Sequence, residues 1–230
     1  MKPTFFFAKL TNWVLGDLAS LKAGRIVTMS RVEGTKGYKQ VVERFVAATE
    51  SINFNKLHQP YLTHIPKAPS HILDIGAGIG RDAAVLASLG HQLVAVEPLY
   101  EFRKVGLERY VSPRIRWVQD FLPRLETLGM SQFDFVLASG VWHHISPDER
   151  EIAMQRIAHL MRPNAIFAVS LRHGPAGGGT HIFPTDHKQT IYTAAMHGLE
   201  LVVCEKKLPS LMPGKDDVFW DKLAFKLRAA

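Results

Sequence analysis

The sequence predicts an α/β fold in which a mostly parallel seven-stranded sheet carries helices on both faces. Three observations predict it. Short apolar segments alternate with amphipathic segments from residue 70 onward, and a glycine-rich turn follows the first apolar segment. Of the 230 residues, 47% are hydrophobic, which is enough for a sizeable core. Strands that alternate with helices pair mainly in parallel, with helices covering both faces of the sheet.

The strands and helices are expected in a simple alternating order. Seven short apolar runs are typical of strands: 71–75, 93–96, 115–118, 133–138, 165–171, 199–204 and 223–227. Three segments with helical spacing lie between them: 83–89, 147–161 and 185–197. The second of these helices has the clearest start, because Ser146 suits an N-cap, Pro147 suits the first position and Glu149 completes a capping box. We expect its core face to include Met161 and Pro163 to end it.

Residues 1–66 differ from the rest of the chain, and we expect a helical cap there, followed by a separate α/β domain over residues 67–230. Apolar residues recur at helical spacing in three segments: 6–18, 41–49 and 54–64. Pro66 and Pro69 then end this part of the chain. The cap either packs as a structural element or forms a lid over a ligand cleft.

Composition limits the cellular setting and the partners. The net charge of +7 favours an anionic partner or reflects a basic surface, since the Lys and Arg residues are scattered. Cys204 is the only cysteine, so an intramolecular disulfide is excluded. Lys9, Asn12 and Asp17 interrupt the N-terminal apolar run too early for a signal peptide, and no stretch approaches a membrane-spanning length. We therefore expect a cytoplasmic monomer or homodimer without membrane contact.

The sequence Asp74-Ile-Gly-Ala-Gly-Ile-Gly80 marks the turn after the first strand. Three glycines in five residues allow a sharp turn and remove side chains that would block a ligand. Dinucleotide-binding turns have the spacing G-x-G-x-x-G, whereas here the third glycine comes one residue early and Arg81 takes its place. The acid before the turn suits a sulfonium and an ammonium better than a diphosphate. The pattern therefore disfavours an NAD-dependent dehydrogenase.

Two acidic residues follow the next two strands. Glu97 ends the second strand about twenty residues after the glycines, where an acid can accept both ribose hydroxyls. The alternative is a solvated charge at a strand end. Asp120 follows the third strand, beside Phe121. It can accept a hydrogen bond from an adenine amino group, or it can cap the segment that follows.

Together with Val96-Glu97-Pro98, Gln119-Asp120-Phe121 and the run 133–145, the glycine motif resembles the class I S-adenosylmethionine-dependent methyltransferases, particularly the bacterial type 11/12 group. The resemblance covers about residues 66–205, with Pro163-Asn164-Ala165 where the family has Pro-Gly-Gly. It implies a Rossmann-like fold and S-adenosylmethionine as cofactor, with the methionine part at the glycine loop, ribose at Glu97 and adenine at Asp120 and Phe121. The residues implied to border the cofactor are Asp74, Gly76, Ala77, Gly78, Gly80, Glu97, Pro98, Asp120, Phe121, Ser139 and Gly140.

Four basic residues follow the fourth and fifth expected strands, at the same edge of the sheet. His143 and His144 are candidates for removing a proton from the acceptor, and Arg172, next to His173, can hold an anionic group. The alternative for each is packing or a structural salt bridge. The eleven histidines show no metal-ligand spacing, so we expect no metal.

The acceptor is limited by what the motifs lack. The segment after the fourth strand is not the Asn/Asp-Pro-Pro-aromatic sequence of enzymes that methylate exocyclic amines of nucleobases. Cys204 lies in an expected strand far along the chain, which disfavours the cytosine C5 enzymes that need a cysteine nucleophile. We therefore expect methyl transfer to an O or N atom of a small-molecule acceptor. An RNA or protein methyltransferase and a cofactor-binding protein without catalysis are the alternatives.

Overall fold

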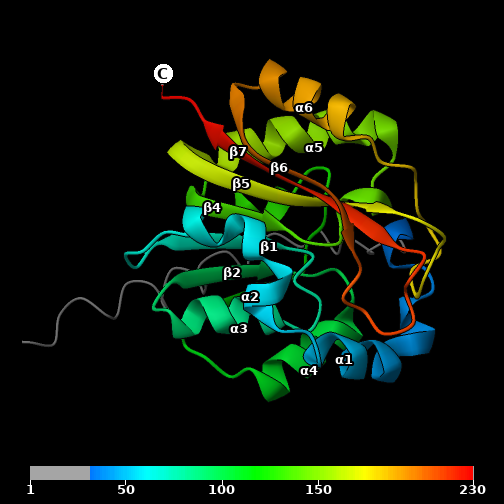
Figure 1. Cartoon of the computed structure of the whole chain (residues 1–230). Helices are drawn as coiled ribbons and strands as arrows, with labels where there is room; N and C mark the ends of the chain where they lie inside the picture. The colour runs from blue at the N-terminus through cyan, green and yellow to red at the C-terminus, as the bar shows by residue number, and fades with distance from the viewer. Residues whose placement is uncertain (1–31, 230) are drawn as a thin grey trace, which may run out of the picture. The chain divides into compact units, whose positions relative to one another are not determined.

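The computed structural model describes residues 32–229, which are built around one seven-stranded sheet (Figure 1). The strand order is β3-β2-β1-β4-β5-β7-β6. The first five strands are parallel, and β7 runs antiparallel to both β5 and β6. The strands are β1 His71–Ile75, β2 Gln92–Val96, β3 Ile115–Val118, β4 Phe133–Ala138, β5 Met161–His173, β6 Leu199–Pro209 and β7 Phe219–Leu227. The expected α/β class and mostly parallel sheet are confirmed.

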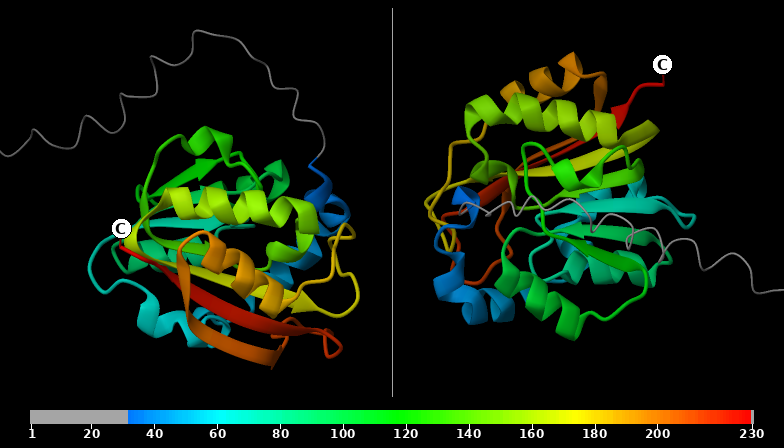
Figure 2. Two further views of the ribbon diagram at one scale, coloured as in Figure 1. Left: turned by 90° about the horizontal axis from the view of Figure 1, so that it is seen from above. Right: turned by 180° about the vertical axis from the view of Figure 1, so that it is seen from behind.

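Helices cover both faces of the sheet, as two further views show (Figure 2). One face carries α5 and α6, and the other carries α2, α3 and α4 (Figure 1). The helices are α1 Val42–Glu50, α2 Phe54–Leu57, α3 Arg81–Ser88, α4 Tyr100–Arg109, α5 Pro147–Leu160 and α6 His187–Met196. The expected helix over 41–49 is confirmed as α1. The segment 54–64 is helical in two short pieces, α2 and a 3₁₀ helix over Gln59–His64. The helix expected over 6–18 lies outside the described residues.

Each face of the sheet has its own apolar core, because side chains of a strand alternate between the faces. Val136 and Phe167 point to one side, where they pack with Ile157 of α5. Phe135 points to the other side and packs with Leu86 of α3. All five of these side chains are at most 1% exposed. Two buried cores fix the strand register and therefore the place where each strand ends.

The two ends of α5 differ in how well the sequence predicted them. The capping box is confirmed, with the Ser146 backbone N–H donating to Glu149 at 3.2 Å. Met161 is buried in the core as expected, but it begins β5 and does not belong to the helix, which ends at Leu160. Its backbone is extended, with ψ of 141°, and it pairs with Phe133 at the start of β5. Asn164 then takes a left-handed conformation with φ of 67°, which asparagine tolerates better than most residues.

Helix α4 was not among the expected elements. Its sequence carries Gly106, and glycine lowers helix propensity by about 1 kcal/mol relative to alanine. The glycine is required by packing, since a Cβ at this position would lie 2.3 Å from the ring of Trp117 on β3. Tertiary contact therefore stabilises a helix that local sequence disfavours.

Residues 32–66 form one compact unit with the sheet. A small apolar cluster joins them to α4, with Val46 of α1 and Phe102 of α4 both buried. Phe45 stacks on Phe102 with ring centroids 4.7 Å apart. This contact brings α1 to the carboxyl edge of β2, the edge at which ligands of open α/β sheets bind.

Candidate active site

The glycine-rich loop joins β1 to α3 at the carboxyl edge of the sheet. Gly76 and Gly80 have φ values of 66° and 82°, in the left-handed region that favours glycine. A Cβ on Gly76 would lie 2.3 Å from Cγ2 of Val141, so no side chain fits there without a shift. A Cβ on Gly78 would meet only Phe45, at 3.9 Å. The loop is therefore tightly packed at Gly76 and open at Gly78.

Glu97 follows β2, and its carboxylate is held against the open part of this loop. Oε2 accepts a hydrogen bond from the N–H of Gly78 at 2.9 Å, and Oε1 accepts one from Leu99 at 2.8 Å. Burial raises the pKa of Glu97 to about 7, although these hydrogen bonds and Arg103 act in the opposite direction. Arg103 also donates to the carbonyl oxygens of Glu97 and Pro98 at 2.6 and 2.9 Å. The end of β2 is thus fixed by charge-assisted bonds.

Asp74 is the acid before the glycines, and one of its oxygens has no partner among residues 32–229. The residue is 3% exposed, and Oδ2 is buried without a hydrogen bond in that part of the chain. Burial and the carboxylate of Asp82 raise the pKa of Asp74 well above its usual range. The charge of Glu97 raises this pKa further, whereas the charge of Arg81 lowers it. A buried polar atom without a partner is costly. An ammonium group is the kind of ligand that fits this oxygen.

Asp120 and Phe121 lie beyond β3. The carboxylate of Asp120 is buried and accepts hydrogen bonds from the N–H of Phe121 at 2.7 Å and from the N–H and hydroxyl of Thr127 at 2.8 and 2.6 Å. The side chain therefore shapes the loop that follows it, although the N-cap position of the next 3₁₀ helix, Glu126–Leu128, is Leu125 and not Asp120. Phe121 is 36% exposed at this edge of the sheet. An apolar ring with an accessible face suits stacking against a base.

Ser139 and Gly140 continue from β4 toward the substrate side of the site. The N–H of Gly140 donates to Oγ of Ser170 on β5 at 2.8 Å. A Cβ on Gly140 would lie 3.9 Å from the indole of Trp220 on β7. Trp220 thereby forms an aromatic wall beside the end of β4, and no sequence motif indicates this residue.

His144 forms a hydrogen-bonded pair with Tyr38, a residue that the sequence motifs did not indicate. Nδ1 of His144 lies 2.7 Å from the carbonyl oxygen of His181, and Nε2 lies 3.0 Å from the hydroxyl of Tyr38. A carbonyl only accepts, so Nδ1 carries the proton and the Tyr38 hydroxyl donates to Nε2. Burial lowers the pKa of His144 despite the bond to His181. The imidazole is therefore neutral, and its tautomer is fixed by both neighbours.

The phenol of Tyr38 lies between the two halves of the site. Burial raises the pKa of Tyr38 to about 12, with the charge of Glu97 acting in the same direction and that of Arg172 against it. Its ring packs edge-on against Phe45, with centroids 5.3 Å apart. The pKa of Tyr38 thus depends on the charges of Glu97, a predicted cofactor residue, and Arg172, a predicted acceptor residue.

His143 lies beside this pair but is engaged differently. Its ring centroid is 4.1 Å from that of His144 and 5.8 Å from that of Trp220. Burial lowers the pKa of His143 well below its usual range, with the charges of His144 and Arg172 contributing. Nδ1 has no hydrogen-bond partner in the described part of the chain. His143 is therefore a neutral ring packed against an aromatic wall.

Arg172 and His173 are adjacent in sequence but lie on opposite faces of β5. Arg172 is paired with Trp220 on β7 and lies on the face that Tyr38 and His144 approach. On the other face, Nε2 of His173 donates a hydrogen bond to the carboxylate of Asp221 at 3.1 Å. The structure therefore brings three of the four predicted acceptor residues together, and it places His173 apart from them.

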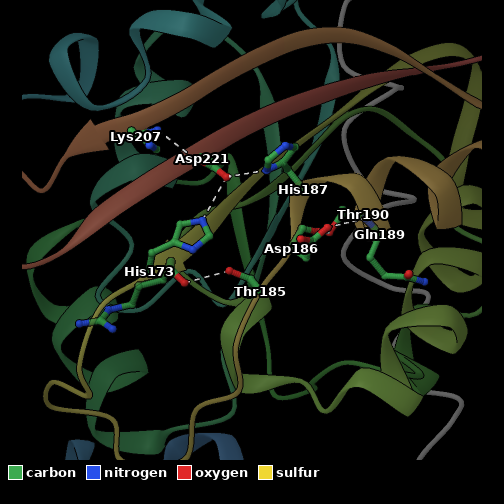
Figure 3. Close-up of polar contacts among 9 residues, drawn as sticks. His173, Thr185, Asp186, His187, Gln189, Thr190, Lys207 and Asp221 are labelled. Carbon is green, nitrogen blue, oxygen red and sulfur yellow. Dashed lines mark hydrogen bonds and ion pairs between the residues drawn. The ribbon is translucent and has the colours of Figure 1, made fainter.

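His173 belongs to a cluster around one buried carboxylate (Figure 3). Oδ2 of Asp221 lies 3.1 Å from Nε2 of His173 and 3.1 Å from Nδ1 of His187, at the start of α6. Oδ1 accepts a hydrogen bond from the N–H of Lys207 at 2.9 Å. The hydroxyl of Thr185 donates to the carbonyl oxygen of Arg172 at 2.8 Å. This cluster fixes both ends of the connection between β5 and α6.

The connection over residues 174–186 runs across the substrate side. The N–H of Thr180 donates to the carbonyl oxygen of Lys36 at 2.9 Å, and that of Phe183 donates to His143 at 2.8 Å. The carbonyl of His181 holds His144, as described above. The connection thus joins the segment before α1 to the loop after β4.

Two further features concern only residues 32–229. No group of three or more His, Cys, Asp or Glu residues in this range is arranged to hold a metal ion. No helix in the same range is long and apolar enough to cross a membrane.

Residues 73–169 match the sequence profile of a family described as methyltransferase domains. None of the curated proteins matches this chain. A TehB-like S-adenosylmethionine-dependent methyltransferase from Corynebacterium glutamicum has a similar structure, with a TM-score of 0.61, 19% identity, and coverage of 83% of this chain and 98% of the other. The 1,6-didemethyltoxoflavin-N1-methyltransferase of Burkholderia thailandensis, bound to 1,6-didemethyltoxoflavin and S-adenosylhomocysteine, is also similar. Its TM-score is 0.56 and its identity 20%, with coverage of 81% of this chain and 90% of the other.

A phosphoethanolamine N-methyltransferase from Haemonchus contortus, in complex with phosphomonomethylethanolamine and S-adenosylhomocysteine, is also similar in structure. Its TM-score is 0.67 and its identity 17%, with coverage of 87% of this chain and 61% of the other. These likenesses agree with the family match and with the ordered motifs at Asp74, Glu97 and Asp120. Residues 73–169 therefore match a family of methyltransferase domains, and the described chain has the fold that these S-adenosylmethionine-dependent methyltransferases share.

Proposed function

We propose that this domain transfers the methyl group of S-adenosylmethionine to an O or N atom of a small-molecule acceptor. The observation that carries the proposal is the Tyr38–His144 pair, a phenol bonded to a neutral imidazole of fixed tautomer. It lies beside the residues that suit the cofactor, since Tyr38 packs on Phe45 and Phe45 lies next to Gly78. The cofactor supplies a methyl carbon on a positively charged sulfur.

The cofactor residues keep the roles that the family resemblance implies. The unpartnered oxygen of Asp74 suits the ammonium of the methionine part, with the open position at Gly78 beside it. The carboxylate of Glu97 suits the ribose hydroxyls, and Phe121 suits the adenine ring. Ala77 and Pro98 contribute backbone to the turns after β1 and β2. Ser139 and Gly140, after β4, run past the methyl-bearing end of the cofactor.

The chain's own residues handle the proton that the acceptor loses. S-adenosylmethionine held by Asp74, Glu97 and Phe121 would supply the methyl group, and its sulfur would take the electrons of the broken carbon–sulfur bond. The acceptor proton moves to the oxygen of Tyr38 while the phenolic proton moves to Nε2 of His144. The resulting imidazolium keeps its Nδ1–H bond to the carbonyl of His181. A phenol and a base coupled in this way avoid a free phenolate, which burial disfavours.

A small acceptor is favoured over RNA or protein by the surroundings of the pair. The connection 174–186 is bonded to Lys36 and His143, so backbone lies across the substrate side. The two similar structures with acceptors bound contain small molecules, 1,6-didemethyltoxoflavin and phosphomonomethylethanolamine. Only the net charge of +7 favours a nucleic acid.

The proposal is tested by following the label of methyl-labelled S-adenosylmethionine. The full chain is incubated separately with a small-molecule extract, with RNA and with protein. We expect label in a small-molecule product that depends on the enzyme, with binding of S-adenosylhomocysteine confirmed by calorimetry. Label in RNA or protein instead would overturn the assigned acceptor class. Binding without transfer to any of the three would support a cofactor-binding protein without catalysis.

Glu97→Ala is expected to weaken binding of S-adenosylhomocysteine by about tenfold or more. Hydrogen bonds to a charged group are worth about 1.5–3 kcal/mol each, and the carboxylate offers two acceptor oxygens to the ribose. Calorimetric titration measures the effect, and Glu205→Ala, at an exposed glutamate of β6, is the matched control. If both variants bind as the wild type does, the ribose is held by another group.

A further inference from the structure

Arg172 is a buried cation without a carboxylate partner among residues 32–229. It is 9% exposed, and the one hydrogen bond that its guanidinium donates there is from Nη1 to the carbonyl oxygen of Gly174 at 3.0 Å. No ion pair within 4.0 Å involves it in that range, although the charge of Asp217 acts on it from farther away. A guanidinium carries five N–H donors, and buried charges are normally paired. The remaining donors therefore suit an anion that is not part of the described chain.

A second cation approaches the same point. If Gly177 carried a Cβ, that atom would lie 3.9 Å from Nη2 of Arg172 and 3.7 Å from Nζ of Lys215. Lys215 belongs to the connection between β6 and β7, and it is half-buried without an ion pair in the described range. Two cationic groups, one at the end of β5 and one in the connection between β6 and β7, thus converge at a glycine that has no side chain to separate them.

The converging cations flank the reacting groups. Gly179, two residues after Gly177, packs against both members of the proton-handling pair, because a Cβ there would lie 2.5 Å from the ring of Tyr38 and 2.7 Å from that of His144. The charge of Arg172 also lowers the pKa of both Tyr38 and His144. On the neighbouring strand β7, Arg172 is paired with Trp220, whose ring packs edge-on against His143 with centroids 5.8 Å apart. An acceptor whose reacting atom is at Tyr38 would therefore present its far end to Arg172 and Lys215.

We propose that Arg172 and Lys215 form a binding site for an oxyanion, a carboxylate or a phosphate, that the acceptor carries. The planar fork of a guanidinium matches two oxygens of either group, and a lysine ammonium adds a compact charge. This assignment rests on the proposed function, because it treats the acceptor as a small molecule. It deepens that function by restricting the substrate to anionic molecules.

Inorganic phosphate and acetate are the probes, because each binds without turnover. Each is titrated into the full chain in a buffer that contains no phosphate or carboxylate, with and without S-adenosylhomocysteine. We expect dissociation constants in the millimolar range for the wild type, with about tenfold weaker binding in Arg172→Gln and several-fold weaker binding in Lys215→Gln. Lys206→Gln, at an exposed lysine of β6, removes the same charge and is expected to change nothing.

The outcomes separate this inference from the proposed function. Unchanged affinity for S-adenosylhomocysteine in Arg172→Gln shows that the variant is folded and that the cofactor site is intact. Weaker phosphate binding in that variant supports a phosphate, and weaker acetate binding alone supports a carboxylate. If neither probe binds the wild type, or if Arg172→Gln and Lys206→Gln bind both probes equally, the anion site is wrong. Failure of the proposed function would instead appear as transfer to RNA or protein, or as no transfer.

Discussion

Tyr38→Phe is expected to lower kcat by about 10²-fold or more while leaving the affinity for S-adenosylhomocysteine within about twofold, because general-base assistance typically contributes 10²–10⁴-fold. The substitution removes the hydroxyl that donates to Nε2 of His144 and keeps the ring that packs on Phe45. Single-turnover rates, measured once an acceptor is known, test this expectation. Tyr192→Phe, at an exposed tyrosine of α6, is the matched control.

A companion variant distinguishes a proton relay from simple packing. His144→Gln should lower kcat by a similar factor, and the double variant should be little slower than either single variant, because the two groups act as one unit. The acid limb of kcat against pH should lie below the ordinary histidine pKa of 6.5, since burial lowers the pKa of His144 and keeps it neutral. If the losses in kcat of the two single variants multiply in the double variant, and the dependence of kcat on pH is the same as in the wild type, the relay is contradicted.

Asp74→Asn is expected to make the protein more stable and its cofactor binding weaker. Its pKa is raised in the folded state above the unfolded value near 3.8, so ionisation opposes folding. Stability therefore falls as pH rises above about 4, and the substitution removes this loss. At pH 8 we expect the Tm to rise by a few degrees, since about 1 kcal/mol shifts a domain of this size by roughly 2–4 °C.

Cofactor affinity should move in the opposite direction. Replacing the carboxylate by an amide removes a charge-assisted bond to the ammonium, so binding of S-adenosylhomocysteine should weaken by about ten- to a hundredfold. Thermal unfolding and calorimetry on the same samples measure both effects, with Asp216→Asn, at an exposed acid, as control. A variant that is less stable and binds normally would show that Asp74 has a purely structural role.

The sequence predicted best where the signal is local. The glycine loop, its preceding acid and the acids after β2 and β3 are short motifs, and backbone contacts within a few residues fix Glu97 and Asp120. Tyr38 could not be found in this way, because its partner His144 lies 106 residues away. The packing of α1 on α4 and the hydrogen bond from Thr180 to Lys36 bring that segment to the sheet edge.

Other differences arise where tertiary packing competes with local preference. Gly106 makes α4 a weak helix by itself, and contact with Trp117 stabilises it. Met161 has the spacing of the α5 core face, but pairing with β4 draws it into a strand. Trp220 reaches the site only because β7 enters the sheet antiparallel beside β5, a pairing that a pattern of apolar runs does not specify.

The opposite orientations of Arg172 and His173 mean that hydrogen-bond register alone decides which basic side chain faces the acceptor. Eight paired positions hold β5 against β7, from Ile166 with Lys226 to His173 with Phe219. A slip of one residue would turn imidazole toward the acceptor and send guanidinium to the α5 and α6 side. Because the same slip would move the buried Phe167 and Val169 to the opposite face, the apolar core that fixes this register also fixes which charge the end of β5 presents on each side.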